Sequence, residues 1–166
     1  MSIASDIEQI KRQEESLRFT GFDEASAWSL GNAMRESAVA RKLPFVIDIR
    51  TGIRPLFYCA LPGSTAENAD WARRKVNTVY RFEAASYRVG LEHKSSGKVF
   101  DQTRGITPLD FAPAGGGFPI RIGPVVIGCV TVSGVPQRDD HNFVVECLAG
   151  FLKVPYAGIA LPPETA

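Results

Sequence analysis

The segment Val125-Val126-Ile127-Gly128-Cys129-Val130-Thr131-Val132 gives the clearest structural signal in this chain of 166 residues. It is a nearly continuous apolar run rich in β-branched side chains, a pattern typical of a strand covered on both faces. We therefore expect residues 125–132 to form a central strand of a sheet. The turn Ser133-Gly134-Val135-Pro136 follows it and leads into a predicted helix over residues 137–152.

Three shorter segments also have the composition of strands. Residues 45–50 and 55–60 are separated by Thr51-Gly52, so they form a predicted β-hairpin. Residues 118–122 form a further predicted strand, at the end of a region in which glycine and proline are frequent. Because the strands come in hairpin-like pairs, we expect a mostly antiparallel sheet with α/β (α+β) layering and not a Rossmann fold.

Helical periodicity surrounds these strands. Asp23 is a predicted N-cap, and either Ser64 or Thr65 caps a later helix. We expect an irregular tail over residues 155–166. The helices predicted before the last one cover residues 3–16, 24–41, 66–84 and 86–93.

Composition excludes several classes of protein. With 45% hydrophobic and 22% charged residues, residues 1–166 are expected to form one globular domain, with its core over residues 23–152. A formal net charge of +1 argues against nucleic-acid and membrane partners. No apolar run approaches the ~20 residues of a bilayer span, and the N-terminus is polar where a signal peptide would be apolar. Three single cysteines suit a reducing compartment, so we expect a cytoplasmic protein.

The chain has few residues suited to metal binding or acid–base catalysis. It contains no Cys-x-x-Cys, no His-x-x-x-His, no Walker A sequence and no Gly-x-Ser-x-Gly elbow. Its two histidines are His93 and His141. His141 is either a surface or interface residue or, with Asp140, a catalytic candidate; either histidine is a candidate metal ligand. Residues one or two apart on a helix face different ways, so Asp139, Asp140 and His141 are a poor local ligand set.

Two glycine-containing segments are candidate anion sites. The glycine run Gly115-Gly116-Gly117 is either a flexible turn before a strand or a loop whose backbone N–H groups approach a ligand closely. Ser133-Gly134 precedes a helix, whose N-terminal N–H groups favour an anion. An anion there would compete with the nearby carboxylates of Asp139 and Asp140.

The predicted helix over residues 66–84 carries an unusual set of side chains. Trp71 and Lys75 are four residues apart, as are Arg73 and Asn77, so two adjacent faces of the helix carry an aromatic ring, cations and an amide. Arg74 extends one of these faces. These residues form either a solvated basic face, a subunit contact, or a clamp for a carboxylate or phosphate group.

Taken together, these motifs resemble the GlcG/HbpS-like haem-degrading-domain superfamily, and most closely its branch known as an uncharacterised protein family. The resemblance covers residues 23–152. It implies a profilin-like fold with a sheet of about five antiparallel strands, helices on its faces, and assembly as a homo-oligomer. It also implies haem, iron or another small molecule as ligand. The residues that carry it are Pro62-Gly63-Ser64-Thr65, Asn68, Trp71, Arg74-Lys75, Asn77, the glycine run with Phe118-Pro119-Ile120, Gly128 to Gly134, and Asp139-Asp140-His141.

We therefore predict an oligomeric small-molecule-binding protein. Its pocket would lie near the glycine run and the Ser133-Gly134 turn, lined by Arg74, Lys75 and Asn77. If haem is the ligand, His141 or else His93 would coordinate the iron.

Two alternatives stay open. One is an enzyme acting on a small carboxylate or phosphate compound, with His141 or Asp140 as acid or base. The sequence supplies no convincing nucleophile for it. The other is a purely structural assembly protein, in which the Trp71 helix and the tail lie in subunit interfaces.

Overall fold

Four strands form a single antiparallel sheet in the computed structural model, which describes residues 2–102 and 105–162. The order across the sheet is β2-β1-β4-β3, so β4 is an inner strand, as its apolar sequence predicts. The strands are β1 (Val46–Thr51), β2 (Arg54–Ala60), β3 (Gly117–Ile122) and β4 (Val125–Ser133).

Both hairpins turn at a glycine. Gly52 joins β1 to β2 and Gly123 joins β3 to β4, each with φ +56°, a conformation that glycine adopts without strain. The fifth strand expected from the family resemblance is absent from the described residues, so that prediction is wrong. At the outer edge of β3, Phe19 forms a single parallel bridge to Ile122 in place of a strand. The glycine- and proline-rich residues before β3 form turns, which leave no stretch long enough for another strand within the described part of this region.

The predicted helices form with small changes at their ends. The Asp23 carboxylate caps α2 by accepting a hydrogen bond from the Ser26 N–H at 2.8 Å. α3 ends two residues before its predicted end because Glu83 adopts a left-handed conformation, and α4 continues three residues further, to its C-cap at Gly97. The helices are α1 (Ile3–Ser16), α2 (Glu24–Ala40), α3 (Ala66–Phe82), α4 (Ser86–Ser96) and α5 (Gln137–Leu152), with short 3₁₀ turns at Phe100–Gln102 and Tyr156–Gly158.

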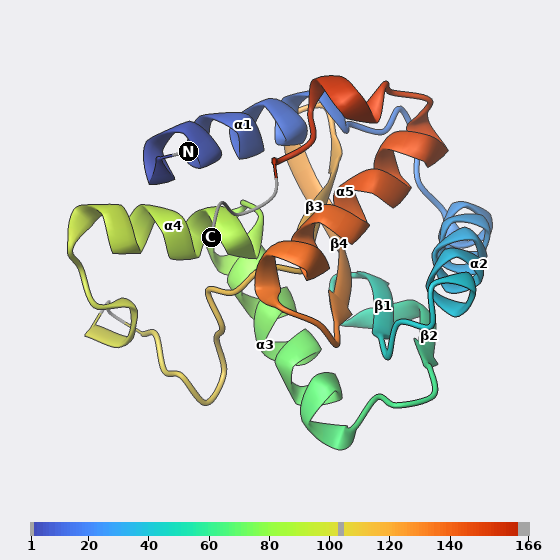
Figure 1. Cartoon of the computed structure of the whole chain (residues 1–166), viewed down its shortest axis with the longest axis horizontal. Helices are drawn as coiled ribbons and strands as arrows, with labels where there is room; N and C mark the ends of the chain where they lie inside the picture. Colours follow the sequence, from blue (N-terminus) through green and yellow to red (C-terminus); the bar gives the residue numbers. More distant parts are fainter. Residues whose placement is uncertain (1, 103–104, 163–166) are drawn as a thin grey trace.

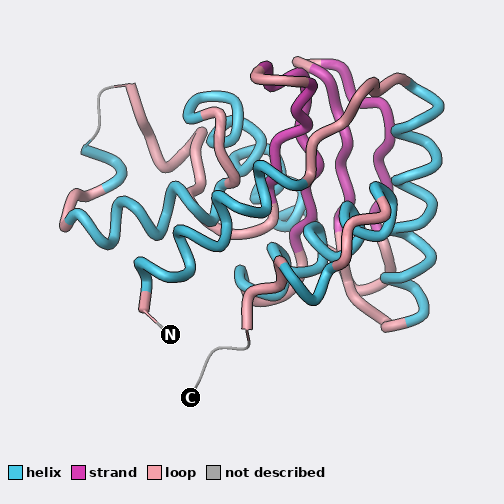
Figure 2. The backbone as a smooth tube through the Cα atoms, turned by 90° about the horizontal axis from the view of Figure 1, so that it is seen from above, coloured by secondary structure: helices cyan, strands magenta, loops and turns pink. Residues whose placement is uncertain are grey.

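Helices cover the sheet on both faces. α2 and α5 pack over the side chains of Ile47, Val130 and Val132, which belong to the main core. α3 packs on the opposite face, where Val76 and Val79 contact Cys129. α1 and α4 lie side by side beyond β3, at the left of Figures 1 and 2, whereas α2 lies at the other end of the sheet.

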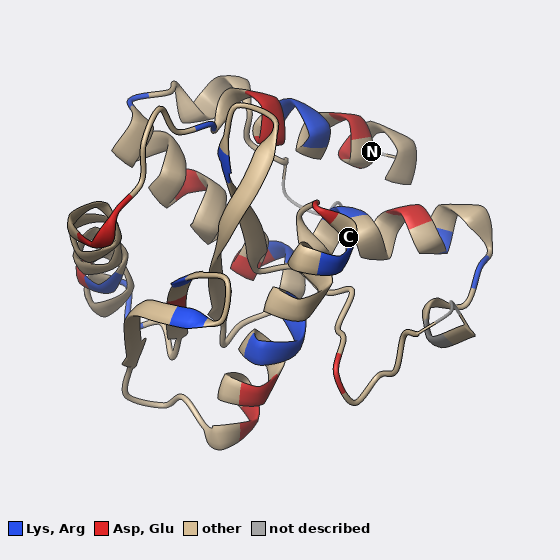
Figure 3. Ribbon diagram, turned by 180° about the vertical axis from the view of Figure 1, so that it is seen from behind, with Lys and Arg blue, Asp and Glu red and all other residues tan. Residues whose placement is uncertain are grey.

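Charges are spread over the described surface. Figure 3 shows lysine and arginine interspersed with aspartate and glutamate along the helices, in agreement with the formal net charge of +1. Within residues 2–102 and 105–162, no helix is long and apolar enough to cross a membrane. The three cysteines are free thiols.

Candidate functional site

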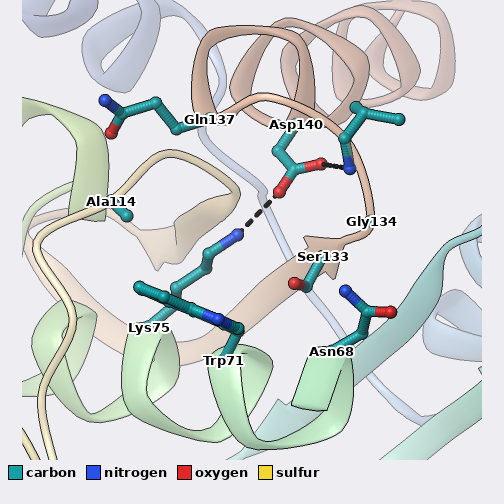
Figure 4. Close-up of a pocket in the computed structure, with 9 residues that line it drawn as sticks. Asn68, Trp71, Lys75, Ala114, Ser133, Gly134, Gln137 and Asp140 are labelled. Carbon is teal, nitrogen blue, oxygen red and sulfur yellow. Dashed lines mark hydrogen bonds and ion pairs between the residues drawn. The ribbon is translucent and has the colours of Figure 1, made fainter. Parts of the chain in front are cut away.

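A cavity of about 440 Å³ lies between α3 and the first turn of α5, beside the end of β4 (Figure 4). We call it the α3–α5 pocket. It forms where the Ser133-Gly134 turn carries the chain from the inner strand into α5. Its lining residues are Asn68, Trp71, Lys75, Ala114, Ser133, Gly134, Val135, Gln137 and Asp140.

One stripe of α3 faces this pocket. Asn68, Trp71 and Lys75 are spaced three and four residues apart, which places their side chains on one side of a helix. The helix is oriented at its start by a capping interaction, in which the Asn68 Oδ1 accepts a hydrogen bond from the Thr65 N–H at 2.9 Å. The pocket therefore has an aromatic wall, an amide and an amine from a single rigid element.

Lys75 and Asp140 form a buried ion pair in this pocket, drawn as a dashed line in Figure 4. Their side chains are 3% and 2% exposed, and Lys75 Nζ lies 2.7 Å from Asp140 Oδ2. Lys75 Nζ also donates to the Val132 carbonyl at 3.1 Å, and Asp140 Oδ1 accepts from the Val135 N–H at 3.0 Å. The pair is thus fixed between α3, the end of β4 and α5.

Burial acts on both members of the pair. It lowers the pKa of Lys75 and raises the pKa of Asp140, because the charged form of each loses solvation; their mutual attraction opposes both shifts. The pair can exist as an ammonium with a carboxylate, or as a neutral amine with a carboxylic acid. Burial makes the free-energy difference between these two states smaller than it is in water. A proton can move from Lys75 to Asp140 at a lower cost than on the surface.

Several donors of the pocket are unpaired in the described part of the chain. Within these residues, no hydrogen-bond acceptor contacts the indole N–H of Trp71 or the amide nitrogen of Asn68. The hydroxyl of Ser133 also lacks a hydrogen bond there, although Ser133 is buried. Figure 4 draws the Asn68 amide and the Ser133 hydroxyl among the side chains that line the pocket. Such a set of donors suits a ligand that carries oxygen acceptors.

Two residues of the predicted clamp do not line the pocket. Arg74 Nε donates to Asp70 at 2.8 Å, and its guanidinium lies over the Trp71 ring, 4.1 Å from the centroid. Asn77 Nδ2 donates to the Asp110 carbonyl at 2.8 Å. Both side chains are therefore used within the protein, Arg74 to support Trp71 and Asn77 to hold the loop before β3. Of the predicted lining residues Arg74, Lys75 and Asn77, only Lys75 lines this pocket.

The glycine run is buried and closely packed, and its contact with a ligand stays a prediction. A Cβ on Gly116, whose φ is +124°, would lie 2.4 Å from the Val132 oxygen and 2.8 Å from Lys75 Nζ. A Cβ on Gly115 would lie 1.9 Å from the Gln137 oxygen. The N–H of Gly117 donates to Ser86 Oγ at 3.0 Å, and that of Gly115 to Gln137 Oε1 at 3.4 Å. The N–H groups of Gly115 and Gly117 are therefore used in hydrogen bonds within the protein.

His141 lies outside the pocket, in the core. It is 0% exposed, and its Nε2 is 2.8 Å from Gln13 Oε1. Burial lowers its pKa to about 3, so the ring is neutral at pH 7. Its Nδ1 has no hydrogen-bond partner in the described structure. A buried ring of this kind is poorly placed for acid–base catalysis or metal binding, and that role stays a prediction.

His93 lies on α4, away from the pocket lining. Its Nδ1 contacts the Val89 carbonyl at 2.8 Å, so Nδ1 carries the proton and Nε2 is left as an acceptor. The rings of Phe82 and Phe100 pack edge-on against it, with centroids 5.7 and 5.0 Å away. Among the described residues, no group of three or more His, Cys, Asp or Glu side chains could hold a metal ion.

The sequence interpretation missed the Lys75–Asp140 pair, although a signal for it was present. Lys75 follows Ala72 by three residues and precedes Val79 by four, so it falls on the apolar stripe of α3. A lysine on such a stripe is buried, and a buried ammonium needs a carboxylate partner. Asp140, in the first turn of α5, is that partner.

Comparison with known proteins identifies the family. The family described as haem degrading protein HbpS-like matches residues 22–149, and this chain belongs to it. A UPF0303 protein of Mesorhizobium japonicum is 46% identical over 165 residues, which is 99% of each chain. The crystal structure of the Ybr137w protein has a TM-score of 0.81 and 26% identity, covering 89% of this chain and 87% of its own. The structure of a PduOC:heme complex has a TM-score of 0.64 and 18% identity, covering 78% and 92%.

Proposed function

We propose that this HbpS-like protein binds a small, flat molecule with carboxylate or carbonyl oxygens in the α3–α5 pocket. The observation that carries the proposal is a set of unpaired donors beside an aromatic face. Trp71 supplies the ring, and its indole N–H and the Asn68 amide have no protein acceptor in the described structure. A ligand ring would stack on Trp71 while its oxygens accept these hydrogen bonds.

Native mass spectrometry of the protein purified from its own cells tests this proposal. Trp71→Ala removes the aromatic wall, and Trp28→Ala is a matched control, because Trp28 lies on α2 and is 63% exposed. We expect the wild type and Trp28→Ala to carry the same added mass per subunit, and Trp71→Ala to lack it. Equal masses for the wild type and Trp71→Ala would contradict the proposal.

Haem is a second candidate ligand, supported by the family description and by the similar fold of the PduOC:heme complex. The α3–α5 pocket does not fit haem iron, because its described lining includes no His, Cys, Met or Tyr. His93 fits better. A proton on Nδ1 held by a backbone carbonyl leaves Nε2 free to coordinate a metal, an arrangement common among ligating histidines. Phe82 and Phe100 supply an apolar surround.

A haem titration distinguishes the two histidines. We expect the Soret shift on adding haem to be lost in His93→Ala and kept in His141→Ala, because His141 is sealed in the core. A shift that survives His93→Ala would contradict coordination by this residue. The small-molecule proposal for the α3–α5 pocket does not depend on this result.

We also propose that the protein is cytoplasmic and forms a homo-oligomer through β2. In the described structure β2 is an edge strand, with one side of its backbone unpaired by any strand. Tyr58, 51% exposed, lies on this strand, and Trp28, 63% exposed, packs against Phe57 of the same strand; a second copy would cover both. Light scattering should give a multiple of 18.1 kDa for the wild type and 18.1 kDa for Trp28→Lys with Tyr58→Lys. A monomeric wild type would contradict this assembly.

A further inference from the structure

We propose that Lys75 is a reactive amine that forms an imine with an aromatic aldehyde or ketone held in the α3–α5 pocket. This inference rests on the proposed small-molecule site and gives it a chemical class of ligand. It also supplies a nucleophile, which the sequence motifs do not indicate.

The geometry around Lys75 Nζ is suited to this chemistry. An ammonium has three N–H groups, and those of Lys75 have two protein partners, Asp140 and the Val132 carbonyl. The third position faces no acceptor in the described structure, and Lys75 lines the cavity. Gly116 leaves space for the amine, because a Cβ there would lie 2.8 Å from Nζ. The amine is thus held in place and is open to a ligand on one side.

Asp140 is placed to act as the proton carrier. Its Oδ2 lies 2.7 Å from Nζ, within direct transfer distance, while its Oδ1 is held by the Val135 N–H. The burial of both groups lowers the cost of the neutral pair. A lysine made nucleophilic by desolvation is a recognised means of attacking carbonyl compounds.

The reaction balances without an added oxidant or reductant. Lys75 transfers a proton to Asp140, and the neutral amine attacks the carbonyl carbon to form a C–N bond. The amine hydrogen moves to the former carbonyl oxygen, which gives a carbinolamine. Asp140 then returns its proton to that hydroxyl group, the C–O bond breaks, and water leaves. The products are an iminium ion on Lys75, ionised Asp140 and one water molecule.

Trp71 selects the class of carbonyl compound. It is four residues before Lys75 on α3, so a ring stacked on the indole would bring its substituent towards Nζ. The Arg74 guanidinium lies over the indole, 4.1 Å from the ring centroid, which restrains the aromatic wall. The ligand therefore needs a flat ring to stack on Trp71 and a carbonyl carbon within reach of Lys75 Nζ. An aryl aldehyde or aryl ketone has both.

The test is reductive trapping with benzaldehyde and sodium cyanoborohydride at pH 7, followed by peptide mapping. The exposed residues Lys42 and Lys153 are internal references. We expect Lys75 to be labelled several-fold faster than either reference, because its amine is fixed beside the bound carbonyl compound and burial lowers its pKa. Labelling of Lys75 no faster than Lys42 and Lys153 would overturn the inference.

Two variants support the assignment. Lys75→Arg keeps a cation beside Asp140 and should give no adduct on α3. Asp140→Asn keeps the shape of the side chain but removes the proton carrier. It also removes the attraction that keeps Lys75 charged, which favours the neutral amine, so slower labelling of Lys75 in this variant is the effect of the lost proton transfer alone. Unchanged labelling in Asp140→Asn would contradict the role of this carboxylate. Circular dichroism shows whether each variant is folded.

A fluorescence titration with benzaldehyde, before the reductant is added, distinguishes failure of the imine proposal from failure of the binding-site proposal. In Trp28→Phe, Trp71 is the only tryptophan. Saturable quenching without a Lys75 adduct would disprove the imine and leave the binding site standing. No saturable quenching and no adduct would count against both.

Discussion

Asp140 and His141 are adjacent on α5, yet the structure uses them in opposite ways. Both are buried, but Asp140 is paired with Lys75 at the wall of a cavity of about 440 Å³. His141 points into the core, against Gln13 and near the rings of Tyr87 and Phe118. One residue can meet a ligand and the other cannot. The burial of a titratable group therefore identifies a candidate site only where a cavity reaches it.

The largest effect should come from breaking the pair at the cavity. Asp140→Ala leaves the buried ammonium of Lys75 without its carboxylate, so the free energy of unfolding should fall by about 3–5 kcal/mol. Urea denaturation at pH 7 measures this. Replacing both members, by Lys75→Met with Asp140→Leu, should restore most of the loss. A loss below about 1 kcal/mol for Asp140→Ala would show that the pair is solvated and behaves as a surface ion pair does.

Filling the space beside the pair should have the next largest effect. Gly116→Ala places a methyl group 2.4 Å from the Val132 oxygen at a φ of +124°, and it should lower the free energy of unfolding by about 3 kcal/mol. Gly150→Ala is the control, because a Cβ at this α5 position meets nothing within 4 Å. If both variants were equally stable in chemical denaturation, the packing role of the glycine run would be wrong.

The sealed histidine should make stability depend on pH. Burial lowers the pKa of His141 to about 3, so between about pH 6.5 and pH 3 the unfolded chain binds a proton that the folded chain does not. The stabilisation that this residue contributes is therefore fully present above pH 6.5 and decreases as the pH falls towards 3. The free energy of unfolding decreases by up to about 1.4 kcal/mol per pH unit. Glu14 and Asp140, whose pKa values are raised by burial, act in the opposite direction.

The contribution of His141 is obtained from the difference between the wild type and His141→Leu. Urea midpoints at pH 7.5, 6 and 5 should converge as the pH decreases. A constant difference over this range would mean that the pKa of His141 is the same in the folded and the unfolded chain, and it would contradict the effect of burial on this ring.

The smallest effect should come from the loop contact outside both regions. Asn77→Ala removes the hydrogen bond to the Asp110 carbonyl and should cost about 1 kcal/mol of unfolding free energy. Benzoate is a flat aromatic carboxylate of the class proposed for the α3–α5 pocket. Its binding should not change in this variant, because Asn77 does not line the pocket. A loss of benzoate binding in a folded Asn77→Ala protein would restore the clamp predicted from the sequence.

Local patterns predicted most of the fold. The apolar run of β4, the hairpin glycines and the Asp23 cap act over a few residues, so their effects can be read from the chain. The number of strands could not be predicted, because the resemblance implies about five strands and does not reveal that Phe19 forms a single bridge to Ile122 in place of a further strand. The absence of a further strand in the described residues follows from the particular turns before β3.

The candidate site was only partly predictable. Trp71, Lys75, Ser133 and Gly134 line one cavity, because their positions follow from helix spacing and a strand-to-helix turn, and their contact with a ligand stays a prediction. Arg74 and Asn77 do not line it, because their side chains bind other protein groups. Arg74 donates to Asp70 on its own helix. Asn77 donates to the Asp110 carbonyl, which belongs to a loop whose path the sequence does not specify. The orientation of His141 depends on α1, which is 128 positions away at Gln13.

The most direct measurement of the central claim is a fluorescence titration with benzoate, which cannot form an imine with lysine under these conditions. Trp28→Phe leaves Trp71 as the reporter, and Trp71→Phe leaves Trp28. The account predicts saturable quenching of Trp71 and only a linear, collisional response from Trp28. Linear responses from both tryptophans would contradict a binding site between α3 and α5.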